Sequence, residues 1–177
     1  MFDEEKGYLE LETRKKIYDS VRKSPGIHFR ELQRRTKLAT GSIEYHLHFL
    51  HRHGLIRTEK RGGFVRYYPT DKAFTEQEKE LLNLLRQEHI RHILVYLIGE
   101  KKRANASKIA EALNISPSSL SWYLNLLMKK NIISVKKKGR FRFYSVVDKE
   151  NIVLALIAYK SSFFDKIVDS FIESWEE

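Results

Sequence analysis

The chain has 177 residues and a formal net charge of +10, with 33 lysine and arginine residues against 23 aspartate and glutamate residues. Its 42% hydrophobic and 12% aromatic content is enough for one sizeable core or two small ones and argues against a disordered chain. The absence of cysteine excludes disulfides, cysteine-bound zinc, iron–sulfur clusters and thiol catalysis. No stretch of 18 apolar residues and no apolar leader occur, so we expect a cytoplasmic protein without a membrane span.

Charge is segregated along the chain. Residues 14–70 and 89–147 each carry a net charge of +10, whereas residues 1–13, 71–88 and 148–177 are net acidic. An ordinary solvated surface mixes the two signs more evenly. Two separate basic blocks therefore indicate two modules that bind a polyanion.

The two basic blocks have the same apolar pattern. A shift of 77 residues aligns them without a gap, pairing Ile17 with Leu94, Leu47 with Leu124, and Tyr67 with Tyr144. Few of the paired positions are identical, but the apolar positions match throughout, which predicts a duplicated domain.

Each block predicts the same series of elements. In the first, Ile17 and Val21 share one helical face, residues 28–36 form a short helix, and residues 41–53 form a third helix. Two strands around a glycine-containing turn follow over residues 55–69. The second block repeats this order, with Ser116 and Pro117 as the cap and first residue of its third helix, over about 118–130.

Two further helical regions lie outside the blocks. Residues 75–78, Thr-Glu-Gln-Glu, form a capping-box pattern that opens a linking helix, with or without a break near residue 88. Beyond Asp148, apolar residues recur at steps of four and three, as on one helix that packs against a partner. We expect a homodimer through this seam, the alternative being that the helix folds back on its own domain; the seam residues are Val153, Ile157, Phe164, Val168, Phe171 and Trp175.

The sequence GSIEYHLHFLHRHGLI resembles the recognition helix and following strand of archaeal and bacterial winged-helix regulators of the ArsR/MarR-like group, and SSLSWYLNLLMKKNII is a weaker copy of it. In the copy, Tyr123 replaces His46 and Asn131 replaces Gly54. The order of elements and the resemblance imply a mainly α fold with small β-hairpin wings (α+β): two tandem winged helix-turn-helix domains plus C-terminal helices. The expected divisions are an acidic segment 1–13, winged-helix domains 14–72 and 89–147, a linker helix 73–88 and a C-terminal segment 148–177.

The face of each third helix opposite its apolar stripe is the candidate surface for base contact in the major groove. In the first domain we expect DNA contacts from Thr40, Gly41, Ser42, Glu44, Tyr45, His48 and Arg52, and in the second from Ser118, Ser119, Ser121, Trp122, Asn125 and Lys129. Tyr45 and Trp122 form a matched pair, and packing on the wing or on another helix is an equal alternative for them.

Basic side chains extend the candidate surface. Glycine-containing basic turns suit phosphate or minor-groove contact, although charge on an edge strand also prevents aggregation. The wing candidates are Lys60, Arg61, Arg66, Lys136, Lys137, Lys138, Arg140 and Arg142. Arg30, Arg34, Arg35 and Lys37 are expected to contact the phosphate backbone.

Four histidines lie close together at positions 46, 48, 51 and 53. Residues two apart lie on opposite helical faces, and the absence of cysteine further weakens a zinc site, so we predict no metal and no cofactor. DNA contact and packing at the helix end are the preferred roles. Direct DNA contact by these histidines predicts an affinity that rises as pH falls through about 6.5.

The sequence predicts a sequence-specific transcription regulator that binds double-stranded DNA at a promoter or operator through two winged helices per chain. We find no P-loop, no Gly-rich dinucleotide turn and no protease or hydrolase motif, so no enzyme is expected. The composition is that of a thermophile's chain, which favours an archaeal source. Archaeal tandem winged-helix regulators include activators of the archaellum operon, and the chain could be one. The alternative is a chromatin-like general DNA binder, or an assembly module that contacts the transcription machinery.

Overall fold

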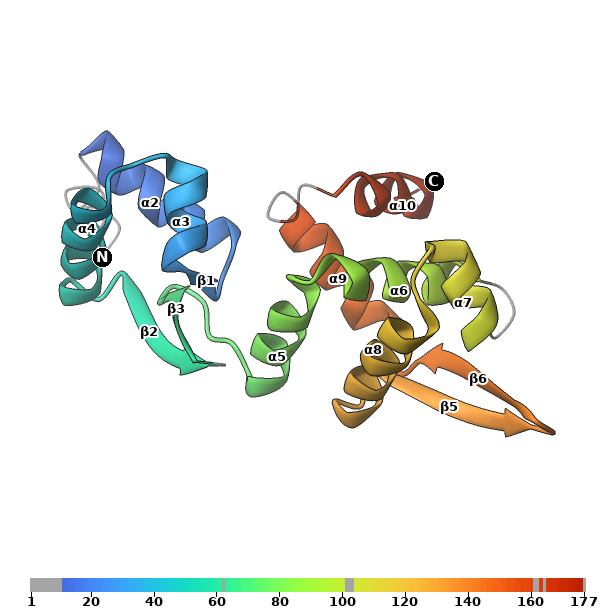
Figure 1. Ribbon diagram of the computed structural model, residues 1–177. Helices are drawn as coiled ribbons and strands as arrows, with labels where there is room; N and C mark the ends of the chain where they lie inside the picture. Colours follow the sequence, from blue (N-terminus) through green and yellow to red (C-terminus); the bar gives the residue numbers. More distant parts are fainter. Residues whose placement is uncertain (1–10, 62, 101–103, 161–162, 164, 177) are drawn as a thin grey trace. The chain divides into compact units, whose positions relative to one another are not determined.

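A computed structural model describes residues 11–61, 63–100, 104–160, 163 and 165–176 (Figure 1). The chain divides into two compact units, residues 1–82 and 83–177. The elements that begin in the first unit are α2 (Glu12–Lys23), β1 (Ile27–His28), α3 (Phe29–Thr36), α4 (Thr40–Arg52), β2 (Ile56–Arg61), β3 (Phe64–Pro69) and α5 (Glu76–Leu85). Those of the second are α6 (Glu88–Gly99), β4 (Ala104–Asn105), α7 (Ala106–Leu113), α8 (Pro117–Lys129), β5 (Ile133–Lys138), β6 (Phe141–Val146), α9 (Lys149–Tyr159) and α10 (Lys166–Glu176).

The duplication extends to the backbone. Each element from β1 to β3 recurs 77 residues later with the same bounds, as α4 (Thr40–Arg52) and α8 (Pro117–Lys129) illustrate. Two helices, a recognition helix and an antiparallel hairpin therefore occur in each unit, and the predicted α+β class with two tandem winged helix-turn-helix domains is confirmed.

Each wing belongs to a three-stranded antiparallel sheet with the order β1-β3-β2 or β4-β6-β5. In the first sheet Arg61 pairs with Phe64 next to the turn, and in the second Lys138 pairs with Phe141. The short strands β1 and β4 were not expected from the sequence, because two residues are too few for a period-2 pattern to show.

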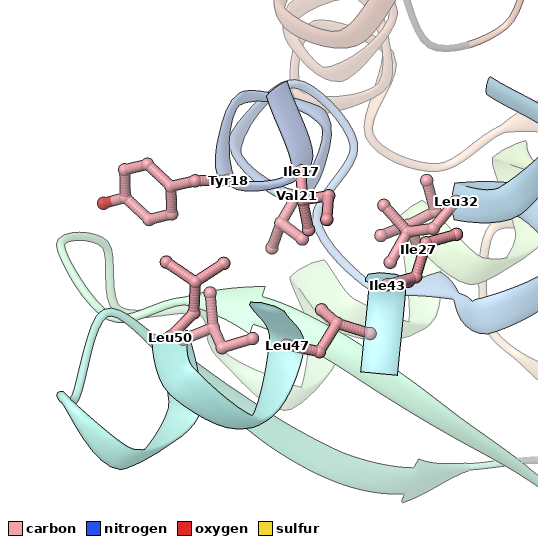
Figure 2. Close-up of a cluster of buried hydrophobic side chains, with 9 residues drawn as sticks. Ile17, Tyr18, Val21, Ile27, Leu32, Ile43, Leu47 and Leu50 are labelled. Carbon is pink, nitrogen blue, oxygen red and sulfur yellow. The ribbon is translucent and has the colours of Figure 1, made fainter. Parts of the chain in front are cut away.

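The core of the first unit lies between α2, α3, α4 and the sheet (Figure 2). Ile17 and Val21 of α2 meet Ile43 and Leu50 of α4, and all four are fully buried. Leu94, Leu120 and Leu127 are buried in the second unit. The apolar stripes predicted from the sequence are thus the core of each unit, which leaves the opposite face of α4 and of α8 exposed.

Two matched backbone positions explain a sequence difference between the copies. Gly54, just after α4, has a φ of 69°, and its counterpart Asn131 has a φ of 55°. Asparagine tolerates the left-handed conformation better than most residues with a side chain, so Asn131 preserves the turn that Gly54 makes.

The helix expected to open at the linker is interrupted. Thr75 and Glu78 form the expected capping box: the Thr75 amide donates to Glu78 Oε2 at 2.7 Å, and the Glu78 amide donates to Thr75 Oγ1 at 3.2 Å. The helix that they open, α5, ends at Leu85, and α6 begins at Glu88. The break near residue 88 is therefore present.

The expectation of one continuous C-terminal helix is wrong. Helix α9 ends at Tyr159 and α10 begins at Lys166, and α10 packs against α6 and α9 of its own unit. Val153 and Val168 of the predicted dimer seam are buried within this unit, so they do not face a second chain. A regular four-three spacing concealed the break, because the pattern continues in register across it.

No described helix is long and apolar enough to span a membrane.

Candidate nucleic-acid interface

The two recognition helices, α4 and α8, present matching exposed faces. Tyr45 is 63% exposed and Trp122 is 58% exposed, both unusually high for aromatic side chains. Each ring lies edge-on to the ring of the next residue, Tyr45 to His46 at 5.1 Å and Trp122 to Tyr123 at 5.0 Å between centroids. The less exposed rings, His46 and Tyr123, support the rings of Tyr45 and Trp122, whose outward surfaces are free to contact another molecule.

Most of the other predicted residues on the two recognition helices are also exposed. The exposed ones are Thr40, Gly41, Glu44, His48 and Arg52 on α4, and Ser118, Ser119, Ser121, Asn125 and Lys129 on α8; Ser42 is half-buried. The start of α4 is fixed by a hydrogen bond from Gln33 Nε2 to Thr40 Oγ1 at 2.9 Å, and the Ser116 hydroxyl accepts from the Ser119 amide at 3.2 Å at the start of α8. Both helix starts are thereby held with small side chains outermost.

The wing of the second unit is open and cationic. Lys136, Lys137, Lys138, Arg140 and Arg142 are all exposed, and none forms an ion pair within the described part of the chain. Five unpaired cations on one hairpin are well suited to phosphate contact.

The wing of the first unit differs because acidic residues hold its main cation. Arg61 pairs with Glu76 and with Glu80 of α5, the latter at 3.2 Å, and its side chain is only 20% exposed. Burial opposes the charged form, but the hydrogen bond with Glu76, together with the charges of Glu76, Tyr68 and Glu80, raises the pKa of Arg61 above its usual value. A second cation, Lys79, donates to Glu59 at 2.6 Å and to Glu76 at 2.8 Å.

The sequence analysis did not predict this network of ion pairs, in which Arg61 and Lys79 share Glu76. Arg61 also pairs with Glu80, and Lys79 also pairs with Glu59. Its members come from β2 and α5, which only the folded chain brings together. Of the other first-wing candidates, Lys60 is exposed, whereas the half-buried Arg66 donates to the Gly26 carbonyl at 3.2 Å.

The expected phosphate contacts also divide. Arg30, Arg34 and Lys37 are exposed. Arg35 instead pairs with Glu31 one helical turn earlier, and both side chains are mostly buried. Three cations near α3 are therefore accessible, while the fourth is neutralised within its own helix.

The histidine cluster does not act as one unit. His46 points inward, and its pKa is lowered first by burial and second by the charge of Arg14. His48 and His51 line a pocket of about 240 Å³ beside Glu44 and Tyr67. Across the part of the chain that the structure describes, no three potential ligands converge on a metal.

Two exposed recognition helices, each followed by a hairpin, define a tandem winged helix-turn-helix protein. Residues 11–82 match the family described as an N-terminal HTH domain, and residues 86–134 match the winged helix-turn-helix DNA-binding family. Each unit therefore contains a helix-turn-helix domain, and the domain of the second unit matches a winged DNA-binding family.

The chain is also similar to an uncharacterized HTH-type transcriptional regulator of Methanocaldococcus jannaschii, with 31% identity over 146 residues. The matched region is 82% of this chain but only 36% of that protein, so the chain spans about a third of its relative. The archaeal relative agrees with the archaeal source expected from composition.

Among solved structures, HlyU from Vibrio cholerae is 20% identical with a TM-score of 0.42, covering 48% of this chain and 90% of that one. A mutant of ZitR from Lactococcus lactis is 22% identical with a TM-score of 0.35, covering 75% of this chain and 80% of that one. Similarity at this level does not bear on function.

Proposed function

We propose that the protein is a transcription regulator that recognises a specific sequence in duplex DNA through two winged helices per chain. The observation that carries the proposal is the matched exposure of Tyr45 and Trp122, 77 residues apart, at the centre of two otherwise polar helix faces. A solvated helix face has no need of a large aromatic residue, and its occurrence at the same place in both copies favours a shared contact.

The two domains contribute differently in this proposal. The second wing supplies most of the phosphate contacts, since its five cations are exposed and without ion pairs among the described residues. The first wing contributes less, because Arg61 is held by Glu76 and Glu80. The first domain relies instead on α4 and on Arg30, Arg34 and Lys37.

Dimerisation remains part of the proposal in a modified form. Ile157, Phe171 and Trp175 of the predicted seam are exposed or half-buried and leave apolar surface for a second chain; Phe164 lies outside the described residues. A dimer would recognise two copies of each half-site with two-fold symmetry.

Selection from a pool of random duplexes at physiological salt tests the proposal. A specific regulator should enrich one motif and bind it about a thousandfold more tightly than random DNA. A motif with two-fold symmetry would support the dimer, and its genomic positions would show whether an archaellum operon is a target. Binding without enrichment, fading steadily with added salt, would instead identify a chromatin-like binder or a module of the transcription machinery.

Tyr45→Ala and Trp122→Ala then show which part of the motif each recognition helix contacts. Each substitution should relax preference at a different part of the motif. If both variants bind the motif as tightly as the parent, the matched aromatic residues are protein contacts and the assembly alternative gains support.

A further inference from the structure

The second unit contains a pocket of about 360 Å³ between α7, α8 and β6. Its walls are mostly apolar and come from Ala106, Ala110, Pro117, Leu120 and Leu124. A few polar groups converge on this apolar surface, namely Ser107, Ser121, Asn125, Arg142 and the Tyr144 side chain. This volume and this mixture of walls are typical of a small-molecule site.

Arg142 gives the pocket its charge. Its guanidinium is the only charged group among the lining residues, and it has no ion pair within the described part of the chain. The side chains of Ser121 and Asn125 likewise lack a hydrogen bond to any described residue. An unpaired guanidinium beside unused hydroxyl and amide groups is suited to an anion, and its planar fork matches a carboxylate.

The equivalent pocket in the first unit provides an internal comparison. It has a volume of about 240 Å³ and is lined at the corresponding positions by Phe29, Glu44, His48 and Tyr67 in place of Ala106, Ser121, Asn125 and Tyr144. Phe29 has a larger side chain than Ala106, which agrees with the smaller volume of the first pocket. Glu44 supplies a negative charge that, after burial, is the second cause of the raised pKa of Tyr67.

Arg142 itself corresponds to Val65 in the first unit. The copies therefore differ at one place in three ways: the second has more room, lacks the carboxylate and gains a cation. The two charge differences favour an anionic guest in the second unit and disfavour it in the first, and the larger volume leaves space for an organic one.

We propose that the pocket between α7, α8 and β6 binds a small organic carboxylate with an apolar body, which pairs with Arg142 and lies against Leu120 and Leu124. A lone phosphate fits less well, because one guanidinium among apolar walls offers too little charge and too few donors for a dianion.

The site has a consequence for DNA binding that rests on the proposed function. Ser121 and Asn125 belong both to the pocket and to the exposed face of α8. A bound carboxylate would engage these side chains and compete with DNA at the second recognition helix. By linkage, DNA would weaken carboxylate binding by the same factor.

Carboxylate binding is measured first without DNA, on the full chain, by titration with benzoate and hexanoate followed by NMR. Benzamide, the neutral counterpart of benzoate, and inorganic phosphate are the comparison ligands. We expect saturable binding of the carboxylates with shifts confined to α7, α8 and β6, and binding of benzamide and phosphate at least about tenfold weaker. Equal binding of benzoate and benzamide, tighter binding of phosphate, or no saturable binding of either carboxylate would overturn the proposal.

Variants localise the site. Arg142→Gln should weaken benzoate binding about tenfold or more, whereas Arg140→Gln, which removes the same charge from the same wing outside the pocket, should leave it unchanged. Ser121→Glu, which introduces the carboxylate of the first unit, should also abolish binding. If Arg140→Gln weakens binding as much as Arg142→Gln, the wing attracts anions generally and the pocket is not the site.

DNA competition is measured separately with a duplex recovered by selection. Benzoate should weaken binding by the parent but not by Arg142→Gln. Failure to bind any duplex would refute the proposed function and leave the titration result standing. Carboxylate binding that leaves DNA affinity unchanged would overturn the competition.

Discussion

The buried ion pair between Arg91 and Asp165 allows a quantitative test of how the C-terminal helix is held. Arg91 Nε donates to Asp165 Oδ2 at 2.7 Å, and the two side chains are only 6% and 5% exposed. His92 Nε2 lies 3.0 Å from Asp165 Oδ1, and the same oxygen accepts from the Ile167 amide at 3.2 Å at the start of α10. One carboxylate therefore anchors α6 and the first turn of α10.

Asp165→Asn removes the charge while keeping an oxygen that can accept from the Ile167 amide. Arg91 is left buried, with the Leu85 carbonyl at 2.9 Å as a remaining partner. Breaking a buried pair by neutralising one side costs about 3–5 kcal/mol, and the retained cap places the expected loss near the lower end, about 3 kcal/mol.

Trp175 on α10 provides the signal. The chain has two tryptophans, so Trp122→Phe leaves Trp175 as the only one, and its fluorescence during urea unfolding reports α10. A loss of about 3 kcal/mol should lower the urea midpoint by at least about 1 M. Glu173→Gln, the same chemical change at an exposed position of α10, is the control and should shift it very little.

Acid provides a second check on the same pair. Burial alone would raise the pKa of Asp165, but the hydrogen bonds with Arg91 and then His92, together with the charges of these two residues, hold the pKa below its usual range. Ionised Asp165 therefore contributes stability above about pH 4 that is lost as pH falls through the lowered value.

If Asp165→Asn and Glu173→Gln unfold at the same urea concentration at neutral pH, the buried pair does not anchor α10 and the reasoning is wrong.

Three other predictions concern the first domain and the wings. Replacing Lys136, Lys137 and Lys138 together by glutamine should reduce the slope of log affinity against log salt by about 3, whereas Arg61→Gln should change it by less than about 1, because Glu76 and Glu80 already hold Arg61; salt titrations of both variants compare them directly. Since the pKa of His46 is lowered in the folded state, stability should fall as pH drops through about 6.5, and His46→Tyr, the residue of the second copy, should flatten that dependence in urea titrations; an unchanged pH profile would count against it. Leu50→Ala should cost about 2–5 kcal/mol, because Leu50 is fully buried between α4 and α2, and a loss under about 1 kcal/mol in thermal unfolding would contradict the assigned core.

Sequence periodicity predicted the repeated elements well because they depend on local pattern. Ile43, Leu47 and Leu50 identify both the buried side of α4 and, by opposition, the exposed position of Tyr45. The same reasoning applied to the second copy placed Leu120, Leu124 and Trp122 correctly.

Pairing between distant charges could not be predicted in this way. Arg61 and Arg35 are basic residues of the kind that contacts DNA, but Glu76 pairs with Arg61 and Glu31 pairs with Arg35. No periodic pattern in the sequence distinguishes these two arginines from Lys137 or Arg34. The break between α9 and α10 could not be predicted from the sequence for a related reason. Asp165 acts as an anchor only because Arg91, 74 residues earlier, lies beside it.

The constant spacing of 77 residues makes the two recognition helices interchangeable in principle. Thr40–Arg52 and Pro117–Lys129 have equal lengths, and each is followed, after the same short turn, by a strand of equal length. Ile43, Leu47 and Leu50 would occupy the places of Leu120, Leu124 and Leu127 without an insertion or deletion. A chimera with α4 in both positions should select a motif that contains the same short sequence twice. The spacing between the two copies would then give the distance along the duplex between the contacts of the two recognition helices.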